Sequence, residues 1–173
     1  MTTSSPLALS PSFERARIWS NVLRCFFIVN FWVTALWLAG VLLVLIWPEA
    51  AKYNPDNSLL SVSSLAMPER IKAVAADVAR TLPALILLYY AIKIFGCFAR
   101  GEVFAPVPIA HIRAAGLWTV IWGFAPTAAR IILDHHVTVK FEPALVAFGI
   151  ATFIAAHVMG EAQRIADENA SIL

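Results

Sequence analysis

Hydrophobic and polar residues follow each other along this chain in long blocks. Four apolar blocks are separated by segments rich in proline, asparagine or charged residues. A helix needs roughly 20 predominantly apolar residues to cross a bilayer. We therefore expect membrane-spanning helices over about 25–47, 81–99, 114–133 and 144–160. The pattern predicts an all-α integral membrane protein with four transmembrane helices in one bundle.

The first block shows the pattern most clearly. It has no charged residue from Cys25 to Trp47, and a helix of that length extends about 34 Å. A cleaved signal peptide would have an apolar region of only about 7–15 residues, so we interpret the block as a retained span. Residues 1–19 are interpreted as a mobile tail and the start of a basic helix. Residues 20–173 are expected to form a single four-span domain.

Prolines divide the middle of the chain. A helix is predicted to begin near Pro68 and to run into the second span, with a kink at Pro83. Residues 98–116, between the second and third spans, read FARGEVFAPVPIAHIRAAG. Pro106 and Pro108 are expected to prevent a regular helix at the start of this segment. We therefore predict an interfacial elbow whose charged residues stay in water while its apolar residues anchor it.

Composition supports a membrane environment. Hydrophobic residues make up 60% of the chain and charged residues 14%, against about 45–50% and 25% in soluble domains. The lipid bilayer is therefore the expected surrounding. The net charge of +2 is too small to indicate direct nucleic-acid binding. A slight excess of Lys and Arg on one side of the spans favours both termini on the cytoplasmic side of a bacterial inner membrane. The two cysteines, Cys25 and Cys97, do not predict a disulfide framework.

Few polar residues fall within the predicted spans. Asn30 is expected to make an interhelical hydrogen bond, and Arg130 to reach the interface and pair with Asp134. The alternative for Arg130 is a functional arginine that faces the inside of the bundle. His157 and Glu161 are four residues apart and share a helix face, so a hydrogen-bonded pair is expected there.

The sequence offers little catalytic chemistry. It has no Gly-rich phosphate loop and no Ser-His-Asp order. The histidines of Asp134–His136 are adjacent, and we interpret that segment as a solvated turn. We expect no catalytic, cofactor or metal site, and the chain is not predicted to be an enzyme.

Small residues recur every four positions in the last span. Ala147, Ala151 and Ala155 would form one narrow ridge on a helix. Such ridges allow helices to approach closely in lipid, where no hydrophobic force drives them together. The ridge is therefore predicted to pack against neighbouring helices.

The elbow also resembles part of a known family. Gly101, Glu102, Val103 and Phe104, followed by Arg113 and Gly116, are similar to the turn between spans two and three of a bacterial four-span family known as domain of unknown function 2975. The final segment, MGEAQRIADENASIL, is similar to the end of that family's last span. The resemblance covers roughly residues 20–173. It implies the four-span topology and genes that tend to lie beside small helix-turn-helix regulators, but no established activity.

Four residues of the elbow are the candidate partner-binding residues: Gly101, Glu102, Phe104 and Arg113. They could simply shape the turn, with Glu102 and Arg113 as a local ion pair. Alternatively, they could form an edge, shared with the C-terminal tail, that binds a cytoplasmic protein such as a small regulator. Two other functions stay open. The chain could be a small transporter or channel with Asn30, Arg130 and His157 along a polar path, or a homo-oligomeric or accessory subunit of a membrane complex.

Overall fold

A computed structural model describes residues 11–49, 64–134 and 139–170, and these residues are helical almost throughout. The helices are α1 (Pro11–Ile46), α3 (Met67–Ala99), α4 (Pro106–Asp134) and α5 (Pro143–Ala170). All four are long and apolar enough to cross a membrane. The prediction of four apolar helices is confirmed, and each extends beyond its predicted span. With 36 residues, α1 is about 54 Å long, well over the ~30 Å of a hydrocarbon core.

A proline stands within the first two residues of each of these helices. The four are Pro11, Pro68, Pro106 and Pro143. Proline suits the first turn because its backbone angle is already helical and the N–H it lacks would have no partner within the helix. The expectation that Pro106 and Pro108 prevent a helix was therefore wrong, since both lie in the first turn of α4. Only residues 100–105 separate α3 from α4.

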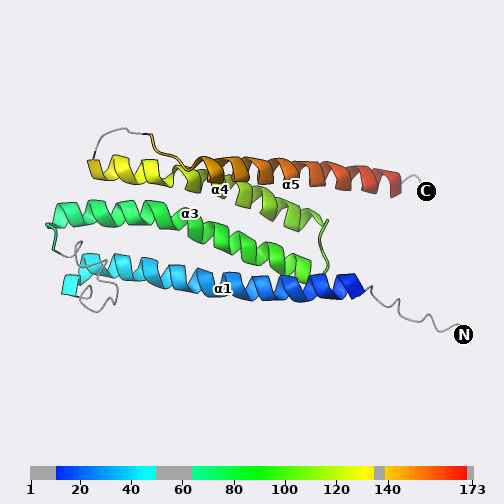
Figure 1. The fold of residues 1–173 in the computed structure, drawn as a ribbon, viewed down its shortest axis with the longest axis horizontal. Coiled ribbons are helices and arrows are strands. Elements are labelled where there is room, and N and C mark those ends of the chain that lie inside the picture. The colour runs from blue at the N-terminus through cyan, green and yellow to red at the C-terminus, as the bar shows by residue number, and fades with distance from the viewer. Residues whose placement is uncertain (1–10, 50–63, 135–138, 171–173) are drawn as a thin grey trace, which may run out of the picture.

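The helices form an open row. In the part of the chain that the structure describes, α1 packs against α3, α3 against α4 and α4 against α5, whereas α1 does not pack against α4 or α5 and α3 does not pack against α5. Figure 1 shows α1 and α5 at opposite edges of this row. The four predicted helices therefore pack as an open row within a single chain. The row has two edges, α1 and α5, each with one helical neighbour.

Both ends of the described chain lie at the same end of the row. The start of α1, the turn at 100–105 and the end of α5 lie together there (Figure 1). We call this the terminal end. The start of α1 and the end of α5 lie together because consecutive helices run antiparallel.

Two kinds of packing hold the row together. Between α1 and α3, Val41 and Val44 pack against Val74, and the rings of Phe27 and Phe95 stack with centroids 5.4 Å apart. Between α4 and α5 the contact is made by glycine. A Cβ atom on Gly116 would lie 2.8 Å from the backbone nitrogen of Phe153, closer than real Cβ atoms come. The backbones of α4 and α5 can therefore touch here only because glycine has no side chain.

The packing face of α5 differs from the one expected. Gly149 and Ala156 are buried, whereas Ala147, Ala151 and Ala155 are exposed. Positions 149 and 156 are seven residues apart and so share a face, while the alanine ridge occupies another side of the helix. Within the chain, close approach of α5 to α4 is thus made at Gly149, which the sequence pattern had not indicated as a packing residue.

Candidate functional site

The turn at the terminal end is built around Gly101. Its φ of 84° lies in the left-handed region, where a side chain would clash with the backbone. The N–H of Gly101 donates to the carbonyl of Phe98, and the N–H of Glu102 donates to the carbonyl of Cys97, both at 3.0 Å. This pair of bonds is the Schellman motif, which ends a helix and satisfies its last carbonyls. Glycine is needed here to end α3 and reverse the chain.

Glu102 pairs with Arg100 rather than with Arg113. The Arg100 Nη2 atom donates to Glu102 Oε2 at 2.9 Å and to Cys97 Sγ at 3.3 Å. The hydrogen bond from Arg100 lowers the pKa of Glu102, and the same bond raises the pKa of Arg100. Both groups are solvent-exposed, so this pair orients the turn more than it stabilises the fold.

Arg113 instead reaches α5. Its Nη2 atom is 3.7 Å from the position that a Cβ atom would take at Gly160. An open pocket of about 270 Å³ lies beside this contact. It is lined by the first two turns of α4 and the end of α5, namely Pro106, Ile109, Ala110, Arg113, Gly160 and Gln163. The structure therefore joins the segment after the turn to the C-terminal segment, as a shared edge would require.

The four candidate residues fall into two groups. Gly101, Glu102 and Phe104 lie in the turn, and the Phe104 side chain is 67% exposed. Arg113 lies inside α4, in the wall of the pocket. Gly160 and Gln163 also line the pocket, and the sequence reading missed them. The signal that could have found them is their spacing of three, which puts both on one face of α5.

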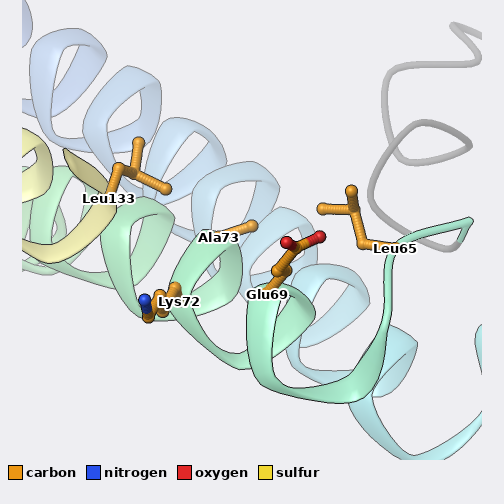
Figure 2. Close-up of a pocket in the computed structure, with 5 residues that line it drawn as sticks. All are labelled: Leu65, Glu69, Lys72, Ala73 and Leu133. Carbon is orange, nitrogen blue, oxygen red and sulfur yellow. The ribbon is translucent and has the colours of Figure 1, made fainter.

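A second pocket lies at the opposite end of the row (Figure 2). It measures about 280 Å³ and is lined by Leu65, Glu69, Lys72, Ala73 and Leu133. Figure 2 shows the Glu69 carboxylate between Leu65 and Ala73, while the Lys72 amino group points away from it. Glu69 stands in the first turn of α3, where a negative charge is favoured by the helix dipole. A structural role therefore accounts for this carboxylate.

The polar residues of the apolar blocks do not converge. The Asn30 Nδ2 atom donates to the Phe26 carbonyl of its own helix at 2.8 Å, so the expected interhelical bond was wrong. Arg130 lies near the end of α4 that is farther from the termini, and His157 is exposed on α5. Because α1 does not pack against α4 or α5, one chain does not join these three residues in a path.

Other expected pairs have different partners or lie outside the described part. Glu161 pairs with Arg164 at 3.0 Å, not with His157. The Asp134 side chain and residues 135–138 lie outside the described residues. The predicted pairing of Arg130 with Asp134 and most of the predicted turn at Asp134–His136 therefore lie outside them too. Among the described residues, no group of His, Cys, Asp and Glu side chains could hold a metal ion. Cys25 is exposed and Cys97 is buried.

Comparison with known proteins adds no relative. No protein-family model, no curated protein and no solved structure matches the chain significantly. The residues of the terminal end are therefore the basis for inferring a function.

Proposed function

We propose that this chain is a multi-pass protein of a bacterial inner membrane, with both termini in the cytoplasm. We further propose that it is an interaction protein whose terminal end binds a cytoplasmic protein partner. The four long apolar helices support insertion in a bilayer. Arginines near the start of α1, Arg15, Arg17 and Arg24, support a cytoplasmic terminal end, because positive charge beside a span is retained on that side.

One observation carries the binding proposal: the pocket between the start of α4 and the end of α5. It joins Arg113, a cation, to apolar surface from Ile109 and to the polar Gln163. The exposed Phe104 ring lies in the adjacent turn. Aromatic and arginine side chains are the ones that most often dominate protein interfaces. The resemblance to domain of unknown function 2975 suggests a small helix-turn-helix regulator as the partner.

The transporter alternative has less support from the structure. A polar path would require polar side chains that face one another across helices, and Asn30 bonds to its own backbone instead. An accessory subunit is more compatible with the open row, since both edge helices are largely exposed.

The proposal is tested by affinity capture from native membranes. The test variant combines Phe104→Ala with Arg113→Ala. The control combines Phe141→Ala with Lys140→Ala, which removes an exposed phenylalanine and a cation at the opposite end of the row. We expect a soluble protein to be captured by the wild type and the control and lost from the test variant. Recovery of the same proteins with all three chains would contradict the proposal.

The orientation is tested separately. A single cysteine at Val103 or at Val139, in a background with Cys25→Ser and Cys97→Ser, is treated with a membrane-impermeant thiol reagent on intact cells. Labelling at Val139 alone supports cytoplasmic termini. Labelling at Val103 alone would show the opposite orientation, with the terminal end outside the cytoplasm.

A further inference from the structure

The outer side of α1 is covered with bulky side chains. Val29, Trp32 and Leu36 are exposed by 61%, 61% and 69%, and their spacing of three and four puts them on one face of the helix. The side chains of α1 that pack on α3 are others, among them Val41 and Val44. The α1 edge of the row is therefore a ridge of large apolar residues.

The outer side of α5 carries small and large side chains next to each other. Ala147, Ala151 and Ala155 are exposed there, away from the face where Gly149 and Ala156 meet α4. Ile154 and Val158 are exposed on the same side by 56% and 60%, so the alanines stand between larger side chains. Small residues let a second helix approach closely in a membrane. The alanine positions therefore leave room between larger side chains for the bulky residues that α1 presents at the other edge.

Charge distinguishes the same two edges at the terminal end. The start of α1 has two exposed arginines and one glutamate, Arg15, Arg17 and Glu14. Arg24 instead lies beside α3, with its Nε atom 3.6 Å from the position of a Cβ atom at Gly96. From Glu161 onward, the described part of α5 has three carboxylates and one arginine, Glu161, Arg164, Asp167 and Glu168. Copies related by rotation about the membrane normal keep their terminal ends on the same side. The basic start of α1 in one copy can then lie beside the acidic end of α5 in the next.

We propose that copies of this chain associate edge to edge, with α1 of one copy packed against α5 of the next. In a two-fold symmetric dimer of this kind, each α1 contacts the α5 of the other copy. The same pairing recurs in a closed ring of more copies. Pairing of α1 with α1 is disfavoured, because it would bring the arginines of both copies together. The proposal is independent of the cytoplasmic partner and concerns the purified protein alone.

Cross-linking tests which edges meet. Cysteine is introduced singly at Ala151, Ala155 or Val158 of α5, where all three side chains are exposed, and the native Cys25 of α1 is kept. We expect oxidation to join two copies at one or more of these positions, and Cys25→Ser to abolish the product. Dimers of the unaltered chain through Cys25 would show that α1 pairs with α1. That result, or the absence of every cross-link, would overturn the proposal.

Substitutions test the surface without relying on cysteine. Ala151→Leu fills the alanine face and is expected to weaken association at least tenfold in detergent or nanodiscs. Ala128→Leu, at an exposed alanine of α4, should leave it unchanged. Arg15→Glu with Arg17→Glu should also weaken association, and Asp167→Lys with Glu168→Lys in the same chain should restore it. Equal effects of Ala151→Leu and Ala128→Leu, or failure of the second charge reversal to restore association, would overturn the pairing.

Discussion

Arg113 of α4 lies over Gly160 of α5, with its Nη2 atom 3.7 Å from the position of a Cβ atom at that glycine. The contact places a cation from the helix after the turn against the segment that leads to the C-terminus. Because position 160 has no side chain, the guanidinium group has room beside α5 at the edge of the pocket. Two segments that are far apart in sequence thereby form one surface.

The size of residue 160 should decide whether this surface persists. Gly160→Ala is expected to be tolerated, because 3.7 Å is ordinary van der Waals contact. Gly160→Leu would displace the guanidinium and should lower capture of the proposed cytoplasmic partner severalfold, with little change in the thermal midpoint. Capture assays with both variants check this, and equal capture by the two would show that Arg113 need not lie over α5.

Close approach of α4 and α5 should be sensitive to a single methyl group. A Cβ atom at Gly116 would lie 2.8 Å and 2.9 Å from backbone atoms of α5, and backbone atoms cannot rotate away. Gly116→Ala is therefore expected to destabilise the fold by about 1–3 kcal/mol, as overpacking usually does.

The matched control for this prediction lies in α1. A Cβ atom at Gly40 would meet nothing within 4 Å, so Gly40→Ala should stabilise α1 by up to about 1 kcal/mol through helix propensity. Unfolding midpoints in detergent measure both variants. A loss of stability in Gly40→Ala equal to that in Gly116→Ala would contradict the packing argument.

The end of α3 should require a residue that accepts left-handed backbone. Gly101→Ala is expected to cost about 1 kcal/mol, because an L side chain is strained at a φ of 84°. Gly101→Asn should lose less, since asparagine adopts this region more readily. Chemical unfolding should show that stability decreases in the order glycine, asparagine, alanine. An alanine variant as stable as the wild type would exclude the Schellman geometry.

The turn at 100–105 should loosen in acid. Hydrogen bonding from Arg100 holds the pKa of Glu102 below its ordinary value of 4.5. Because the pKa is lower in the folded state, the pair contributes its full stabilisation above the ordinary pKa. This stabilisation is lost as the pH falls through the folded-state pKa. Hydrogen exchange at the turn amides should therefore speed up below pH 4.5, after correction for intrinsic rates. Glu102→Gln should lack this acid response, and an equal response in both chains would contradict the prediction.

Local composition alone was enough to predict where the helices lie along the chain. The uncharged block from Cys25 to Trp47 and the end of α3 at Ala99 follow from the lengths of apolar runs, which neighbouring helices do not alter. The placement of the start of α1 and the end of α5 at one end of the row follows from the even number of helices. Proline was harder to interpret, because Pro106 and Pro108 can either end a regular segment or begin one, and only the structure showed that they begin α4.

Which face of each helix packs was decided only by the tertiary structure. In a soluble protein an apolar face points to the core, but in lipid both the packed face and the lipid-facing face are apolar. The spacing of Ala147, Ala151 and Ala155 therefore could not show whether that ridge or Gly149 meets α4. The same holds for Glu102, whose partner depends on the left-handed turn at Gly101. Sequence determined that there are four long apolar helices, and tertiary packing determined their faces and the open row.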